Sequence, residues 1–312
     1  MNIGIDMMGG DYAPAEAVKG IGQFLDEGHD AVKLVLVGDE ALVRPLLAEH
    51  AIPENRIVMI HASEVIGMHE HPTAALKAKP DSSISKGFKA LATGGCDAFI
   101  SAGNTGAMLV GSLFSIKALQ GVIRPTISTI MPSVHGGSGL LLDVGLNADC
   151  KPEHLNQFAI MGTVYAKLIL GIETPRVALI NVGEEEGKGN MLAKATYPLL
   201  KENKHIHFIG NIEGRDILHD KADVMVCDGF TGNILLKMAE SLHEIARERK
   251  LQDEYFERFN FENYGGTPVL GVAKPVIIGH GISESRAFVN MIKLAEKMLA
   301  GKLMETMIEE LS

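Results

Sequence analysis

Seven short loops carry most of the residues that can do chemistry in this chain. They are rich in Gly, Asn, Asp, Thr and Ser, and each precedes a stretch with helical character. The loops are Asp6–Asp11, Ser101–Gly106, Gly145–Asp149, Gly183–Asn190, Gly210–Asp216, Asp228–Asn233 and Gly279–Ser283. Free backbone N–H groups and the helix dipole attract anions at helix starts. Turns and helix caps alone would explain any single loop, but the set of seven favours a polar or anionic ligand.

Motifs for a protein nucleophile, a nucleotide or a metal are missing. Gly183–Gly189 has three residues between its first two glycines, where a P-loop has four, and Gly189 stands where a magnesium-binding Ser or Thr is needed. No GxGxxG, GxSxG or HExxH pattern occurs, and His69 and His71 lie two residues apart beside Pro72. We therefore predict no nucleotide hydrolysis and no metal site.

The missing nucleophile is consistent with a substrate that supplies its own attacking oxygen. If phosphate is the acceptor, the protein needs only to position it, donate hydrogen bonds to a carbonyl oxygen and assist the leaving group. The residues by themselves thus predict an α/β enzyme or binder for a small anion, with no metal and no covalent intermediate.

The elements that must hold these loops are short apolar runs. Several are continuous rather than alternating, which is typical of strands buried on both faces. The runs are Ile3–Ile5, Leu34–Val37, Ala98–Ile100, Leu140–Val144, Val177–Ile180, His207–Ile209, Val224–Val226 and Val276–Ile278. Because they alternate with helical stretches, we predict an α/β fold with a mostly parallel sheet and helices on both faces. Ligands of such sheets bind beyond the carboxyl ends of the strands.

Three longer segments complete the pattern. Phe99–Ile116 is uncharged, but Ser101–Gly106 interrupts it, so we interpret it as strand, turn and buried helix rather than a membrane span. Ile234–Phe261 predicts a long helix or helical hairpin that leaves the sheet, and Glu284–Leu311 predicts one long amphipathic helix. We expect one α/β domain over residues 1–312, with 234–262 as a helical excursion at a dimer or partner interface.

Composition restricts the partners and the compartment. The 312 residues are 46% hydrophobic and 22% charged, an ordinary mix for a globular protein. A formal net charge of -10 makes general binding to nucleic acid or to an anionic membrane unfavourable. Cys96, Cys150 and Cys227 lie far apart, and no basic n-region or signal peptide opens the chain, so a reducing, cytoplasmic location is expected.

The loop sequences, taken in order, resemble the acyl carrier protein:phosphate acyltransferases of phospholipid synthesis (the PlsX family). The matching stretches are IDMMGGDYAP at Ile5–Pro14, DSSISKG at Asp81–Gly87, DAFISAGNTGA at Asp97–Ala107, LLLDVGLNAD at Leu140–Asp149, LINVGEEEGKGN at Leu179–Asn190, GNIEGRD at Gly210–Asp216, DGFTGNILLK at Asp228–Lys237, YGGTPVLG at Tyr264–Gly271 and IGHGIS at Ile278–Ser283. The chain departs from the family at Met7, where alanine is usual, and between Asn233 and Tyr264, where family members carry a longer segment.

The resemblance implies a Rossmann-like fold, a homodimer and no metal or nucleotide cofactor. It implies transfer of a fatty acyl group from acyl carrier protein to inorganic phosphate. The acyl phosphate would then feed a membrane acyltransferase, so contact with that enzyme or with the membrane surface is expected. The alternatives are a phosphotransacetylase-type enzyme that uses acyl-coenzyme A, and a non-catalytic protein that binds an anion or acyl carrier protein.

The candidate site residues lie in the matching loops. We predict catalytic roles for Lys188, Asn233 and His280, with Lys188 neutralising phosphate or the oxyanion, Asn233 donating a hydrogen bond and His280 protonating the leaving thiolate. Competing structural roles are a solvated lysine beside Glu184–Glu186, a helix N-cap and a structural histidine. The expected phosphate or substrate contacts are Asp6, Gly9, Gly10, Asn104, Thr105, Gly106, Thr231 and Gly232. Asp6, Asp11 and Asp228 are expected to hold loops in place.

Overall fold

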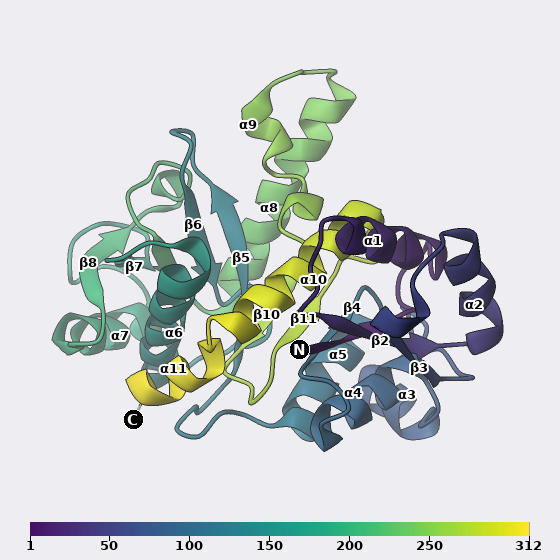
Figure 1. The fold of residues 1–312 in the computed structure, drawn as a ribbon. Helices are drawn as coiled ribbons and strands as arrows, with labels where there is room; N and C mark the ends of the chain where they lie inside the picture. The colour runs from purple at the N-terminus through teal and green to yellow at the C-terminus, as the bar shows by residue number, and fades with distance from the viewer. Residues whose placement is uncertain (312) are drawn as a thin grey trace. The chain divides into compact units, whose positions relative to one another are not determined.

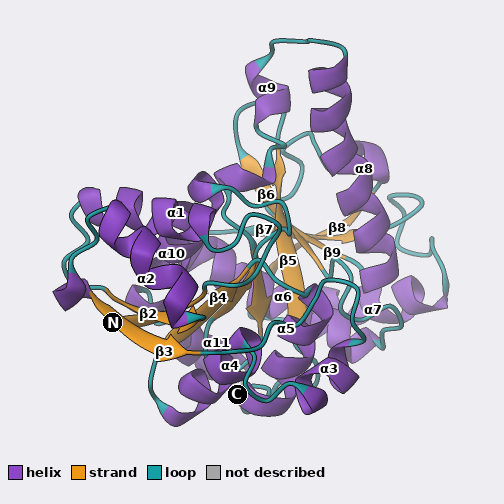
Figure 2. Ribbon diagram, turned by 90° about the vertical axis from the view of Figure 1, so that its right-hand side faces the viewer, coloured by secondary structure: helices purple, strands orange, loops and turns teal. Residues whose placement is uncertain are grey.

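The computed structural model describes residues 1–311 and divides into two compact units. The first contains Met1–Ala118 and Phe261–Ala300, and the second contains Leu119–Asn260 and the chain from Gly301 onward. Each unit holds its own set of strands and helices, and Figures 1 and 2 show helices flanking the strands. The predicted α/β class is confirmed.

The first unit has a sheet in the order β3-β2-β1-β4-β11-β10. All of its neighbouring strands run parallel except β10, which is antiparallel to β11. The strands are β1 (Asn2–Asp6), β2 (Lys33–Gly38), β3 (Ile57–His61), β4 (Ala98–Ser101), β10 (Thr267–Leu270) and β11 (Val276–Ile278). Its α-helices are α1 (Ala15–Asp26), α2 (Glu40–Glu49), α3 (Pro72–Ala78), α4 (Ser83–Thr93), α5 (Thr105–Gly111) and α10 (Ser285–Ala300). Figure 1 shows α1 and α10 on one side of this sheet and α4 and α5 on the other.

The second unit has the strand order β5-β6-β9-β7-β8. Only β5 is antiparallel to its neighbour. The strands are β5 (Thr126–Pro132), β6 (Ser138–Leu142), β7 (Arg176–Ile180), β8 (His207–Ile212) and β9 (Val224–Val226). The α-helices are α6 (Pro152–Tyr165), α7 (Met191–Glu202), α8 (Gly229–Glu248), α9 (Glu254–Glu257) and α11 (Leu303–Leu311). Helix α6 packs against β6 and β9, with α7 and α11 beside it.

The predicted runs became strands, and most are buried as expected, whereas β8 is exposed at His207 and Ile209. In β2, β4 and β9 nearly every residue is buried, because helices cover both faces. Three strands were not predicted: β3 has the continuous apolar run Ile57–Ile60 but is partly exposed, β5 contains Thr and Ser, and β10 contains Pro268 after Gly265 and Gly266. Strand β6 ends at Leu142, two residues before the predicted run does.

The prediction of one helix over Glu284–Leu311 is wrong. Helix α10 ends at Ala300 and α11 begins at Leu303, because Gly301 and Lys302 form a turn in which Lys302 has φ 51°. A positive φ cannot continue a right-handed helix. Phe99–Ile116 is a strand, a turn and helix α5 continued by a π-helical turn over Ser112–Ile116, as expected, but the helix is not buried throughout, since Phe114 is 75% exposed. In residues 1–311 no helix is both long and apolar enough to cross a membrane.

The predicted helical excursion consists of α8 and α9. Helix α8 buries only Gly229, Gly232 and Ala246 along its 20 residues. The short helix α9 is followed by Arg258, whose guanidinium donates to the carbonyls of Ser133 and Gly137 and to the Ser138 hydroxyl. The excursion therefore returns to the turn between β5 and β6, and Figure 1 shows α8 and α9 projecting beyond the rest of their unit.

Candidate functional site

The loops after β1 and β4 are joined through the carboxylate of Asp6. This buried side chain accepts hydrogen bonds from the Met8 N–H (3.0 Å) and the Ser101 hydroxyl (2.6 Å). The Ser101 Oγ in turn accepts the Gly103 N–H at 2.9 Å. Burial raises the pKa of Asp6, while these donors oppose the rise. Asp6 thus holds two strand ends together, as predicted for its loop role.

Close packing explains the glycines of these loops. A Cβ at Gly9 would lie 2.5 Å from Asp6 Oδ2 and 2.6 Å from the Gly103 nitrogen. Gly10 has φ +97°, and a Cβ there would lie 3.1 Å from the Gly281 carbonyl oxygen. The loops after β1, β4 and β11 therefore pack directly on one another, which requires glycine whether or not a ligand approaches.

Asn104 uses its side chain to organise the protein. Its amide nitrogen donates to the carbonyls of Gly67 (2.9 Å), Met68 (3.2 Å) and Glu70 (3.1 Å), and its Oδ1 caps helix α5 at the Ala107 N–H. A substrate contact through the Asn104 amide would have to displace these bonds. The neighbouring predicted contacts differ: Thr105 is exposed, whereas Gly106 packs tightly against Pro72.

His280 is exposed after β11, and its ring stacks on Phe261 with the ring centroids 4.8 Å apart. Next to it, the Gly281 carbonyl accepts the Asp11 N–H at 2.7 Å. The imidazole is therefore held at the surface of the first unit and remains accessible. Asp11 itself is exposed, and its backbone rather than its carboxylate makes this loop contact.

The loop after β6 is organised by Asp143, which sequence reasoning did not single out. The buried Asp143 carboxylate accepts the N–H groups of Gly145 (3.0 Å), Leu146 (2.9 Å) and Asn147 (2.8 Å), and the Asn147 amide at 2.6 Å. Burial raises the pKa of Asp143 against these four donors. The signal for this role was present in the sequence, since an Asp followed by Gly and Asn commonly folds its own backbone around its carboxylate.

Helix α8 starts directly against this loop. Its N-cap is Asp228, which accepts both the N–H and the hydroxyl of Thr231 at 2.9 Å. A Cβ at Gly232 would overlap the Asp143 carbonyl oxygen, so only glycine permits the contact. The predicted loop role of Asp228 is confirmed, and Thr231 and Gly232 hold the helix start in place.

Asn233 does not cap the helix, so the alternative reading of this residue as an N-cap is wrong. It lies beyond the first four residues of α8 and is exposed. Its side chain is next to the loop after β6, because a Cβ at Gly145 would lie 3.3 Å from Asn233 Oδ1. No hydrogen bond of this side chain is recorded within residues 1–311, which leaves the amide accessible for a substrate.

Lys188 lies in a loop fastened by two asparagines at the ends of β7 and β8. Asn181 Nδ2 donates to the Lys188 carbonyl at 3.1 Å, and Asn211 Nδ2 donates to the Glu185 carbonyl at 3.0 Å. Two of the adjacent glutamates bind other lysines: Glu184 pairs with Lys221 and Glu186 with Lys201. Lys188 is exposed, and in the described part of the chain no ion pair involves it.

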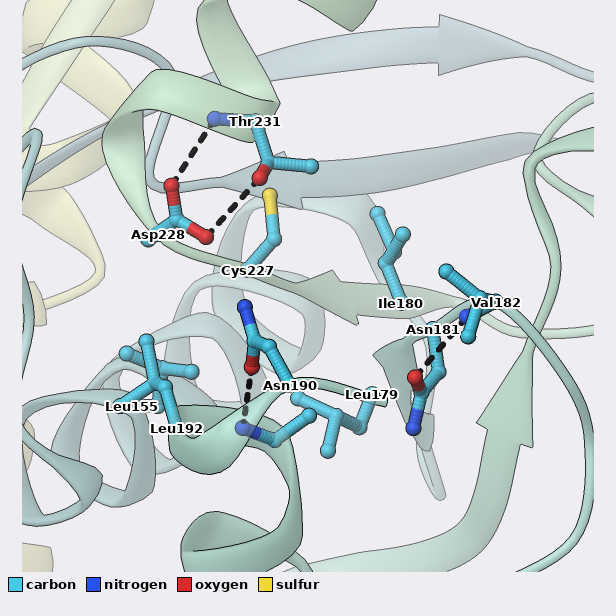
Figure 3. A pocket seen from close by; sticks show the side chains of 11 residues that line it. Leu155, Leu179, Ile180, Asn181, Val182, Asn190, Leu192, Cys227, Asp228 and Thr231 are labelled. Carbon is cyan, nitrogen blue, oxygen red and sulfur yellow. Dashed lines mark hydrogen bonds between the residues drawn. The ribbon is translucent and has the colours of Figure 1, made fainter. Parts of the chain in front are cut away.

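A cavity of about 180 Å³ lies between the starts of α7 and α8. Figure 3 shows Asp228 and Thr231 on one side of it and Asn190 facing them, with Cys227 between. Asn190 caps α7 through the Ala193 N–H. The aliphatic part of the lining comes from Leu155, Leu179, Ile180, Val182, Leu192 and Ala193, and Asn181 completes it. The lining contains a carboxylate but no cationic side chain.

The cysteines are poor nucleophiles at neutral pH. Burial raises the pKa of Cys96 to about 11 and that of Cys150 to about 12, and it raises the pKa of the buried Cys227 as well. A thiol with such a pKa is almost wholly protonated at pH 7. Across residues 1–311 we also find no group of three or more His, Cys, Asp or Glu side chains that could hold a metal ion.

Four lysines, Lys77, Lys79, Lys86 and Lys89, lie on or next to α3 and α4, and two of them form ion pairs. Lys86 pairs with Asp81 at 2.5 Å, and Lys79 pairs with Glu70 at 2.6 Å. The cluster is thus opposed both by Asp81 and by Glu70, which comes from the loop before α3. Lys77 and Lys89 are exposed.

Comparison with solved structures defines the class of fold. A phosphotransacetylase from Streptococcus pyogenes aligns with a TM-score of 0.67 and 18% identity, covering 96% of this chain and 94% of that one. A branched-chain phosphotransacylase from Enterococcus faecalis gives a TM-score of 0.59 at 16% identity, covering 96% of this chain and all of the other. At these identities the likeness concerns the fold alone.

The sequence matches give the family. The model of the family described as fatty acid synthesis protein matches residues 1–306. Proteins called phosphate acyltransferase match along the whole length: the one from Dictyoglomus turgidum is 42% identical over all of this chain and 98% of its own, and that from Halothermothrix orenii is 44% identical over 95% and 94%. The chain belongs to this phosphate acyltransferase family.

Proposed function

We infer that this chain transfers a fatty acyl group from acyl carrier protein to inorganic phosphate, releasing acyl phosphate and the free carrier thiol. The observation that carries this inference is identity above 40% to phosphate acyltransferases along the whole chain. Such an enzyme is an acyltransferase of fatty acid and phospholipid synthesis. The absence of a protein nucleophile motif is consistent with direct attack by phosphate.

In the proposed reaction a phosphate oxygen attacks the thioester carbonyl carbon. Lys188 neutralises charge on phosphate or on the developing oxyanion, and Asn233 donates a hydrogen bond to one of them. His280 donates a proton to the leaving thiolate. The exposed Lys188 ammonium, with no recorded ion pair, and the exposed Asn233 amide support the first two roles, and the exposed imidazole supports the third.

The test is product trapping with hydroxylamine, which converts acyl phosphate to a hydroxamate. We expect hydroxamate only when enzyme, acyl-[acyl carrier protein] and phosphate are all present. A matched series with acyl-coenzyme A separates this reaction from that of the phosphotransacetylases, whose fold is shared. Binding of acyl carrier protein without any hydroxamate would instead favour a non-catalytic binding protein.

We further propose a cytoplasmic homodimer that joins through α8. Phe230, Ile234, Met238 and Ile245 are 64%, 52%, 67% and 51% exposed, and their spacing puts them on one side of the helix. An exposed apolar stripe of this kind commonly marks an interaction surface.

Membrane contact is proposed to be weak and salt-sensitive. Of the basic residues after Asn233, Lys237 pairs with Glu240, and Arg258 binds the turn between β5 and β6. A helix that lies on a membrane usually has a cationic polar face, which this segment lacks because acidic residues are interspersed. Flotation with anionic vesicles at physiological salt should recover little protein, and strong recovery would contradict the proposal.

A further inference from the structure

We propose that the cavity between the starts of α7 and α8, which Leu192 helps to line, receives the part of the acyl chain nearest the thioester. This inference rests on the proposed acyl transfer and adds a binding subsite to it. The cavity lies beyond the carboxyl ends of β7 and β9, where open parallel sheets bind ligands.

The lining favours an uncharged, mostly apolar group. Six of its eleven residues are aliphatic, and Leu155, Leu179 and Ala193 among them are buried. The Asp228 carboxylate faces the same space, and the lining offers no cationic side chain to oppose it. A phosphate ion would therefore be repelled here, whereas methylene groups would gain from leaving water.

The polar groups at the cavity are largely engaged already. Thr231 donates its hydroxyl to Asp228, and Asn190 Oδ1 accepts the Ala193 N–H. The Cys227 thiol donates to the Asp143 carbonyl at 3.7 Å. Because these polar groups already have hydrogen-bond partners in the protein, an acyl chain that enters the cavity leaves few of them unsatisfied. The Asn190 amide nitrogen faces the cavity in Figure 3 and can donate to a carbonyl oxygen.

The size fits a segment of a chain rather than a whole fatty acid. An apolar protein cavity of about 150 Å³ holds one benzene molecule, so a cavity of about 180 Å³ has room for roughly six carbon atoms. Val182 at 80% exposure and Met191 at 90% exposure lie at the ends of the loop that borders the cavity. Of the two, Val182 also lines the cavity, so its exposed side chain gives the more distal carbons an apolar surface to contact.

The experiment compares acyl-[acyl carrier protein] donors of different chain length in a variant that fills the cavity. Leu192→Trp adds bulk to a lining residue, whereas Met191→Trp adds the same bulk to the preceding residue, which is exposed and outside the lining. Burying one methylene is worth about a fourfold gain in affinity. Excluding two of them should thus lower the octanoyl-to-butyryl ratio of kcat/KM by roughly tenfold in Leu192→Trp. Met191→Trp should keep the wild-type ratio, and the KM for phosphate should not change.

An unchanged ratio in a folded Leu192→Trp protein would overturn the proposal, as would an equal fall in Met191→Trp. Thermal unfolding shows whether Leu192→Trp folds. If it does not fold, the smaller substitution Leu192→Phe is used in its place. Calorimetric binding of the same octanoyl and butyryl donors separates the two inferences. If wild-type protein makes no acyl phosphate from any donor, the proposed function fails. The difference in affinity between the octanoyl and butyryl donors then tests the proposed acyl-binding cavity by itself.

Discussion

Lys188 is the residue whose removal should affect the chemistry most directly. Loss of one charge-stabilising donor typically costs about 10²-fold in kcat or more. We expect Lys188→Ala to lower kcat by about that factor, and Lys188→Arg to restore part of it because the charge returns. Lys194→Ala, at an exposed position on α7, is the control. Steady-state kinetics with saturating phosphate measures the effect, and a change below twofold would remove Lys188 from the mechanism.

The three cysteines give a second prediction at the same scale. Because burial keeps Cys96, Cys150 and Cys227 protonated, none should form an acyl-enzyme. The variant in which all three are alanine should keep most of its turnover. Its free energy of unfolding should fall, by about 1 kcal/mol at each buried position. Mass spectrometry of the wild type mixed with donor alone should find no acyl adduct; an adduct would refute direct attack by phosphate.

Helix α6 contains a histidine that should make stability depend on pH. Burial lowers the pKa of His154, with Arg124 and Lys151 adding to the effect and Glu153 opposing it. The Nδ1 of His154 accepts the Lys151 N–H at 3.1 Å, which requires that nitrogen to be unprotonated. The unfolded chain therefore takes up the proton first, and stability is lost as the pH falls from 6.5 towards the lower folded pKa.

Replacing this histidine tests the assignment. In His154→Gln the decline of the free energy of unfolding below pH 6.5 should become shallower than in the wild type. His50→Gln, at an exposed position after α2, should keep the wild-type slope. Urea unfolding at a series of pH values gives these slopes. Identical slopes for His154→Gln and the wild type would mean that a group other than His154 causes the pH dependence of stability.

We propose that cations on α3 and α4 meet acyl carrier protein, which is acidic in the family that the chain belongs to. Lys79 and Lys86 are bound to acidic neighbours, so Lys77 and Lys89 are the better candidates. Reversing both to Glu should raise the KM for the acyl-carrier donor and flatten its salt dependence, with kcat at saturation nearly unchanged. Because exposed pairs contribute only about 0.2–1 kcal/mol each, the rise in KM should be moderate. The same reversal at Arg247 and Arg249 is the comparison, and wild-type behaviour in both would exclude both surfaces.

At the scale of the whole molecule, the apolar stripe of α8 should decide the oligomeric state. Ile234→Glu combined with Met238→Glu introduces charge where a partner would bury apolar surface, which an association cannot tolerate without a counter-charge. Light scattering after gel filtration should report a dimer for the wild type and a monomer for this variant. Glu244→Ala on the same helix should remain dimeric. A monomeric wild type would refute the proposed dimer.

Local sequence pattern was enough to predict the α/β class, most strands and the loops. Continuous apolar runs such as Leu34–Val37 and Val224–Val226 predicted buried strands correctly, because a strand that is buried on both faces is apolar at nearly every position. The family followed from motif order, and the loop role of Asp228 followed from its position before a helix. Strands β5 and β10 were missed because pairing with neighbours, rather than local pattern, makes them strands, whereas β3 has a continuous apolar run, Ile57–Ile60, that was present in the sequence.

Local pattern did not reveal which polar side chains are bound to other parts of the protein and which remain accessible, because that depends on the three-dimensional fold. Asn104 and Asn233 look alike in sequence, each near a Thr and a Gly, yet Asn104 is buried on three carbonyls while Asn233 is exposed beside Gly145. Lys188 sits beside three glutamates in the sequence, but Lys221 and Lys201, distant along the chain, bind two of them. The Gly and Asn that follow Asp143 signalled a turn, but the structure shows that four donors converge on its carboxylate. Hydrogen bonds and ion pairs depend on distances between atoms, and distances between residues remote in sequence are set by packing.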